Sequence, residues 1–211
     1  MIALTFDDGP GPTTPEVLDA LKAHRVLATF FVIGRNVVES PWTDDRNAGW
    51  SIVKRAIIEG HTVGNHTYTH AREAQNELEF CNEVEKTDHL IQELMIEAGL
   101  SLRVPPLRLP FGLRPKDARL NFIGSLGRTH VHWSTDFDDW HEGAIEGLFP
   151  EILAYIETRT SMGLNSVLDL HDGGIGGESG YRRPATADAV RRLLDESKKR
   201  GWEFFQSPVA L

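Results

Sequence analysis

Short apolar runs alternate with amphipathic stretches along most of the chain. The runs typical of β-strands are IALTF (2–6), LATFFVI (27–33), HTVGNH (61–66), LRL (107–109), HVHWS (130–134), SVLDLH (166–171) and WEFF (202–205). Helices are predicted near 14–24 and 49–59, over 75–98, and in a last segment that has Pro184 in its first turn and Gly201 as its stop. This alternation predicts an α/β fold with a mainly parallel sheet, either open or closed into a barrel.

The composition narrows the class of protein. Of the 211 residues, 40% are hydrophobic and 25% are charged, and no repeat or linker divides them, so we expect 1–211 to form one domain. The net charge of −9 argues against nucleic acid or an anionic membrane as partner. No apolar run approaches the ~20 residues that span a bilayer. We expect a monomer.

The N-terminus does not have the pattern of a signal peptide. It runs from Met1 into the acidic pair Asp7–Asp8 without a basic region. A cytoplasmic protein and a trimmed domain of a secreted protein both fit this pattern, and the sequence does not choose between them.

Polar residues cluster where the predicted strands end. They are Asp7 and Asp8, His66 and His70, Arg108, the segment 136–140 and His171. In parallel α/β folds the ligand site lies at the carboxyl ends of the strands. Five separate strand ends therefore direct their polar side chains to one place.

The adjacent aspartates Asp7 and Asp8 point to a bound cation, because like charges at a buried strand end repel each other. His66 and His70 have the i, i+4 spacing that lets two imidazoles on one helical face bind a single metal. Two unrelated histidines are the simpler alternative. One carboxylate and two imidazoles would leave positions open for water, and the second carboxylate could take a proton from that water.

Three further residues could complete such a site. Arg108 could hold a carboxylate and fix the direction of the free aspartate. His171, if it is not a core histidine, could protonate a leaving amine. Trp140 could contact a sugar or acyl group, although core packing is an equal alternative.

Taken together, TFDDGP, HTYTH, RLPFG, DFDDW and LHD resemble, in order and spacing, the five motifs of the polysaccharide deacetylase family, also called NodB-homology or carbohydrate esterase family 4 domains. The resemblance extends from Ile2 to about Phe205. It implies a distorted (β/α) barrel in a single domain. It also implies metal-dependent removal of N- or O-acetyl groups from carbohydrate.

The resemblance also assigns roles by position. It implies that Asp7 is the general base, oriented by Arg108, and that His171 is the general acid, tuned by Asp136. The implied metal ligands are Asp8, His66 and His70, with Zn²⁺ as the usual metal. The implied substrate-binding residues are Trp140, Leu170, Pro110 and Phe111.

Asp169 departs from the family pattern, which commonly has an apolar residue two positions before the final histidine. Strand alternation puts Asp169 on the same face as His171. A buried carboxylate is costly unless it is paired or protonated. Asp169 could pair with a nearby cation, contact a polar or cationic substrate group, or be turned outward by a bulge.

The sequence thus predicts a hydrolase of the amide bond of N-acetylglucosamine in chitin-like or peptidoglycan-type substrates, with O-acetyl groups of xylan as a further substrate. Two alternatives stay open. One is an amidohydrolase of the same fold acting on a formamido sugar or a non-sugar amide. The other is a catalytically silent carbohydrate-binding module that retains the metal.

Overall fold

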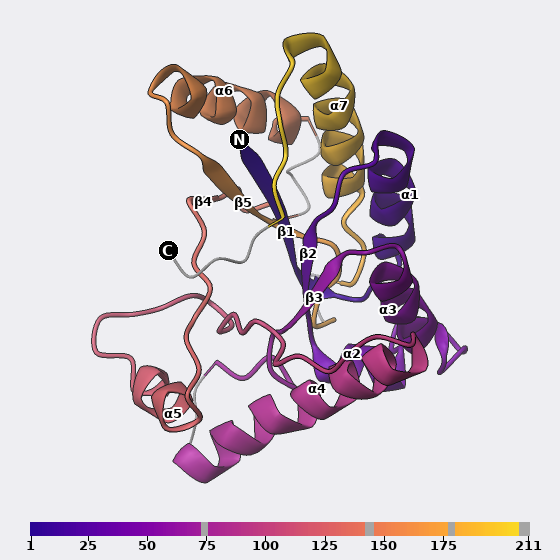
Figure 1. The fold of residues 1–211 in the computed structure, drawn as a ribbon, viewed down its shortest axis with the longest axis vertical. Helices are drawn as coiled ribbons and strands as arrows, with labels where there is room; N and C mark the ends of the chain where they lie inside the picture. Colours follow the sequence, from indigo (N-terminus) through magenta and orange to yellow (C-terminus); the bar gives the residue numbers. More distant parts are fainter. Residues whose placement is uncertain (73–75, 142–145, 177–179, 207–211) are drawn as a thin grey trace.

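The computed structural model describes residues 1–72, 76–141, 146–176 and 180–206 (Figure 1). The strands are β1 (Ile2–Gly9), β2 (Thr29–Val32), β3 (Thr62–Asn65), β4 (Thr135–Asp136) and β5 (Ser166–His171). The helices are α1 (Thr14–His24), α2 (Gly34–Glu39), α3 (Ala48–Ile58), α4 (Glu77–Glu97), α5 (Arg119–Ser125), α6 (Leu148–Ser161) and α7 (Pro184–Arg200). No helix in these ranges is both long and apolar enough to cross a membrane.

The strands are all parallel and lie in the order β3-β2-β1-β5-β4. Beyond β3, Leu107 pairs with Asn65, and His130 pairs with Leu107. The segment that starts at His130 then continues into β4, which pairs with β5. The strand pairing therefore returns to its starting point, which confirms the predicted distorted barrel.

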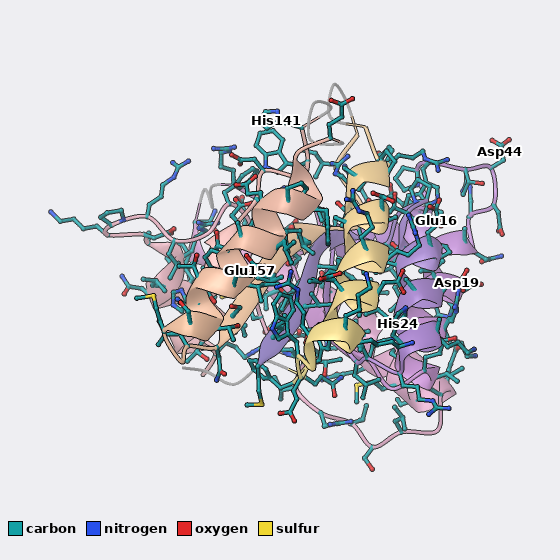
Figure 2. All side chains as sticks on the ribbon, turned by 90° about the horizontal axis from the view of Figure 1, so that it is seen from above. Glu16, Asp19, His24, Asp44, His141 and Glu157 are labelled. Carbon is teal, nitrogen blue, oxygen red and sulfur yellow. The ribbon has the colours of Figure 1, made fainter. Side chains whose placement is uncertain are left out.

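The hydrophobic core lies between the strands and the helices around them. All eight residues of β1 are buried, and the rings of Phe6 on β1 and Phe30 on β2 stack with their centroids 5.0 Å apart. In Figure 2, α6, α7 and α1 lie side by side, with Glu157 on α6 and Glu16, Asp19 and His24 along α1. Because helices pack against the sheet, the polar side chains predicted to form the site are left accessible at the ends of the strands.

The predicted elements agree with the structure best where the apolar pattern is long. The helix near 14–24 and the strand 166–171 are confirmed, and the last helix begins at Pro184 and ends before Gly201, whose φ is 66°. The short runs near 107, 130 and 204 form single bridges rather than strands. Helix α2 was not predicted.

Candidate active site

A cavity of about 470 Å³ lies at the carboxyl ends of the strands. Among the described residues, its buried lining consists of Asp7, Asp8, His66, Gly112, Asp169 and Arg183. Its half-buried wall consists of His70, Trp133 and His171, and its exposed rim of Arg72, Phe111, Arg114, Asp136, Asp138, Trp140 and Ile175. The predicted convergence of polar side chains on one place is thus present in the structure.

Asp8, His66 and His70 form a compact cluster in this cavity. Asp8 Oδ1 lies 3.0 Å from His70 Nε2 and 3.4 Å from His66 Nε2, and one ligand atom from each residue lies within 4.8 Å of the others. Asp8 Oδ1 is buried and accepts no hydrogen bond from a described residue. Burial alone would raise the pKa of the Asp8 carboxyl, but His70 and His66 hold that pKa well below its usual value. A carboxylate and two imidazoles converging on one point fit a divalent metal such as zinc.

The two histidines do not share a helical face, so that part of the prediction is wrong. They lie on a loop after β3, in which Thr67 has φ 64° and His70 has φ 61°, values that no α-helix contains. The loop is held by the side chain of Asn65, whose Oδ1 accepts a hydrogen bond from Thr67 N at 2.8 Å. His66 Nδ1 lies 2.8 Å from the Arg108 carbonyl oxygen. Donation from Nδ1 to that oxygen leaves the lone pair on Nε2, which is the atom nearest Asp8.

Asp7 and Asp169 share one buried guanidinium. Arg108 is fully buried, and its Nη1 lies 2.8 Å from Asp7 Oδ1 and 2.7 Å from Asp169 Oδ1. Burial raises the pKa of Asp7 to about 6, although Arg108 and His171 act in the opposite direction. Burial, and after it the charge of Asp7, raise the pKa of Asp169 well above its usual value. Asp169 nevertheless lies against a cation, because Arg108 Nη1 donates to its Oδ1, and its regular register opposite Thr5 leaves no bulge that could turn it outward.

The partner of His171 is Asp139, whereas the sequence had predicted Asp136. His171 Nδ1 lies 2.6 Å from Asp139 Oδ1, and His171 N donates to Asp139 Oδ2 at 2.9 Å. Burial alone would lower the pKa of His171, but Asp139 raises it well above its usual value. Asp136 is exposed at the rim, and the positive φ of Asp138 (50°) turns the chain so that the next residue enters the site. The signal for Asp139 was its place directly before Trp140 in DFDDW.

Comparison with known proteins identifies the family. The sequence model described as "Polysaccharide deacetylase" matches residues 1–131. The chain belongs to the polysaccharide deacetylase family. The family, the fold and the enzyme class, a hydrolase that removes acyl groups, agree with the predictions from sequence.

Relatives of this polysaccharide deacetylase align over nearly its whole length. It is 34% identical to the chitooligosaccharide deacetylase of Bradyrhizobium sp. (strain ANU 289), over 98% of this chain and 89% of that protein. It is 32% identical to a peptidoglycan-N-acetylglucosamine deacetylase of Bacillus cereus, over 98% of this chain and 66% of that protein. Among solved structures, the Bc1960 peptidoglycan N-acetylglucosamine deacetylase is 31% identical with a TM-score of 0.71, covering 98% of this chain and 86% of that one. The polysaccharide deacetylase Bc1974 from Bacillus cereus is 30% identical with a TM-score of 0.67, and the match covers 99% of this chain and 92% of that one.

Two of the four predicted substrate-binding residues of this polysaccharide deacetylase line the cavity. Trp140 and Phe111 stand at its rim, and Phe111 packs on His70 with the ring centroids 4.5 Å apart. Leu170 is fully buried in the hydrophobic core, because strand alternation turns it away from the cavity face of β5. Pro110 is buried outside the lining, where its carbonyl accepts a hydrogen bond from an arginine.

Trp133 and Arg183 are the two lining residues behind the exposed rim that the sequence analysis missed and that carry an aromatic or charged side chain; Arg72, Arg114 and Ile175 at the rim were missed as well. The Cζ atom of the Arg108 guanidinium lies 5.2 Å from the ring centroid of Trp133 and 4.2 Å from the ring centroid of Phe31. The apolar run 130–134 contained Trp133, so a strand face directed at the cavity could have indicated it. Arg183 directly precedes α7, and no spacing in the sequence connects it to the other site residues.

Proposed function

We propose that this protein is a metal-dependent deacetylase that hydrolyses the N-acetyl groups of N-acetylglucosamine in chitin-like or peptidoglycan-type oligosaccharides. The observation that carries the proposal is the placement of Asp7 beside His171. The two residues are register partners on the adjacent strands β1 and β5, and the cluster of Asp8, His66 and His70 lies beside them. The residues proposed as base, metal ligands and acid thus line one cavity.

The chain itself supplies the proton transfers. A zinc ion held by Asp8, His66 and His70 would polarise the acyl carbonyl and lower the pKa of water. Asp7 is placed to take the proton of the attacking water, and Arg108 holds its carboxylate in one orientation by the 2.8 Å contact from Nη1.

His171 is placed to give a proton to the leaving nitrogen. Its contact with Asp139 keeps the ring charged and fixes its orientation, so that Nε2 carries the proton to be donated. Trp140 and Phe111 at the rim offer aromatic faces to the sugar ring.

The test compares zinc-loaded and chelator-treated protein on an N-acetylglucosamine tetramer, with acetate followed by proton NMR and free amine by mass spectrometry. Acetate release that requires zinc supports the proposal, and an Asp7→Asn variant should keep its zinc while its rate falls by roughly 10²–10⁴. Binding of the oligosaccharide by zinc-loaded protein without any turnover would favour a silent binding module. Acetylated xylan in a parallel reaction tests O-deacetylation.

A second candidate is an amidohydrolase of the same fold that removes a different acyl group, such as the formyl group of a formamido sugar. It is favoured by the buried part of the cavity lining, which among the described residues contains polar side chains and one glycine. Asp169 is part of that lining, and an acetyl methyl gains nothing from contact with a carboxyl group. An N-formyl oligosaccharide in the same assay separates the two candidates.

A further inference from the structure

The short segment 33–36, where β2 passes into α2, contacts three loops of the site: the turn after Asp7 and Asp8, the loop of His66 and His70, and the loop that follows His171. Three of its backbone amides donate to carbonyl oxygens of those loops: Ile33 to Gly9 at 2.8 Å, Gly34 to Thr67 at 3.0 Å and Arg35 to Tyr68 at 2.9 Å. We call this segment the α2 junction. Gly9 follows the aspartate pair, and Thr67 and Tyr68 lie between the two histidines.

Asn36 is the member of the α2 junction that acts through its side chain. It is fully buried, and its Nδ2 donates to the carbonyl oxygen of Asp8 and to that of Gly174, both at 3.0 Å. Two carbonyl oxygens require two donor hydrogens, so the chemistry fixes the orientation of the amide. One side chain thus joins the loop of the metal ligand Asp8 to the loop that follows His171.

The backbone of Asp8 needs such support. Its φ is 67°, in the left-handed region that is unfavourable for residues other than glycine. Such a conformation persists where its surroundings hold it, and the hydrogen bond from Asn36 holds the carbonyl of this residue. If Asp8 relaxed to an extended conformation, its carboxylate would turn away from His66 and His70.

The α2 junction is closely packed at Gly34. A Cβ atom on Gly34 would lie 2.6 Å from Thr87 Oγ1 and 2.6 Å from Tyr68 Cδ2. Helix α4, which carries Thr87, and the histidine loop, which carries Tyr68, therefore close directly on the start of α2. Asn36 thus extends from a closely packed segment.

We propose that Asn36 is a positioning residue that sets the metal affinity of this site by holding Asp8 in its left-handed conformation, and that aligns His171 through Gly174. The inference deepens the proposed function and rests on it for the identity of the metal-binding cluster. Partners that hold the ligands of a metal site typically change metal affinity or activity by 10–100-fold when they are replaced.

The test measures the zinc dissociation constant by competition with a chromogenic chelator, at a temperature where the metal-free protein is folded by circular dichroism. Asn36→Leu has a similar volume and no donor, and we expect it to bind zinc about 10–100-fold more weakly than wild type. Asn36→Ser retains one donor, so we expect an intermediate value. At saturating zinc, kcat should also fall while KM changes little, because His171 is misaligned and the sugar contacts are intact.

Thr87→Val is the matched control. Thr87 is fully buried, and its hydroxyl donates only to the carbonyl of Glu83 in its own helix, at 3.2 Å. The control loses a buried hydrogen bond in the same region without a link to the site loops, so its zinc affinity should stay within about threefold of wild type.

Folded Asn36 variants whose zinc affinity lies within about threefold of wild type would overturn the proposal. So would an equal loss in Thr87→Val, because the effect would then be a general loosening of the structure. Wild-type protein that binds no zinc would overturn the metal-dependent function together with this inference. Normal wild-type turnover with unaffected variants would overturn the role of Asn36 alone.

Discussion

Replacing Asp169 with leucine tests whether the acyl group reaches the buried end of the cavity. Nη1 of Arg108 has two hydrogens and three acceptors within reach, namely Thr5 Oγ1 at 2.8 Å, Asp7 Oδ1 at 2.8 Å and Asp169 Oδ1 at 2.7 Å. Asp169→Leu removes the third acceptor and leaves the guanidinium paired with Asp7. The variant should therefore fold, with a free energy of unfolding within about 2 kcal/mol of wild type.

The expected gain in acetyl hydrolysis follows from two contributions. Burying a methyl-sized group against hydrocarbon contributes about 0.8 kcal/mol, which is about fourfold in rate. Relieving the desolvation of a carboxyl group by that methyl adds about 1 kcal/mol, which is about another fivefold. We therefore expect kcat/KM for an N-acetyl substrate to rise about 20-fold in Asp169→Leu.

The assay compares N-acetyl and N-formyl forms of one chitooligosaccharide with wild type, Asp169→Leu and Asp169→Asn, all loaded with zinc. The formyl group has no methyl, so its kcat/KM should change little in Asp169→Leu. Asp169→Asn keeps the shape and polarity of the side chain and should show no gain. A folded, zinc-loaded Asp169→Leu with an unchanged acetyl-to-formyl ratio would refute the reasoning, because the acyl group would then lie away from Asp169.

Three further predictions concern charged groups. Asp139→Asn should lower kcat/KM by about 100-fold and move the alkaline limb of its pH profile to lower pH, because the charge that raises the pKa of His171 is lost. The control variant Asp136→Asn should change neither quantity. Equal pH profiles for the wild type and Asp139→Asn would contradict Asp139 as the partner of His171. Arg108→Leu leaves the two buried carboxyl groups of Asp7 and Asp169 without a cation, so the free energy of unfolding in urea should fall by about 3–5 kcal/mol. An unchanged urea midpoint would contradict a stabilising role for these two ion pairs. Burial raises the pKa of Asp172 to about 7. The folded metal-free protein therefore holds a proton that the unfolded chain releases near about pH 4. The free energy of unfolding should fall as the pH rises from about 4 to about 7. Between pH 5 and pH 8 this fall amounts to about 3 kcal/mol, and Asp172→Asn should remove it in urea titrations at those two pH values. An unaltered pH dependence would exclude this group as its cause.

The parts of the fold that were predicted correctly are those set by long, regular patterns. The periodic apolar face of 14–24 and the β-like run 166–171 are local signals, and both elements have the predicted bounds. The convergence of the site follows from topology, because the carboxyl ends of parallel strands meet at one edge. Helix α2 gave no such signal, since it has six residues, begins with Gly34 and has no side-chain cap.

Two of the incorrect details of the site, the helical histidines and the partner of His171, share a physical cause. Among the described residues, eight other than glycine have positive φ, and five of them belong to the site: Asp8, His70, Phe111 and Asp138 line the cavity, and Thr67 lies between its two histidines. Local sequence preference disfavours such a backbone, so it exists only where the surrounding fold imposes it. The helical interpretation of the two histidines failed at Thr67 and His70, and the choice of Asp136 over Asp139 failed at Asp138. Side-chain chemistry therefore indicated polar groups that the structure brings together at one cavity, whereas their pairing depended on backbone conformations that residue patterns do not encode. The same reasoning explains why the sequence did not indicate Asn36. Its side chain donates a hydrogen bond to the carbonyl of Asp8, one of those five residues, and it has no catalytic chemistry of its own.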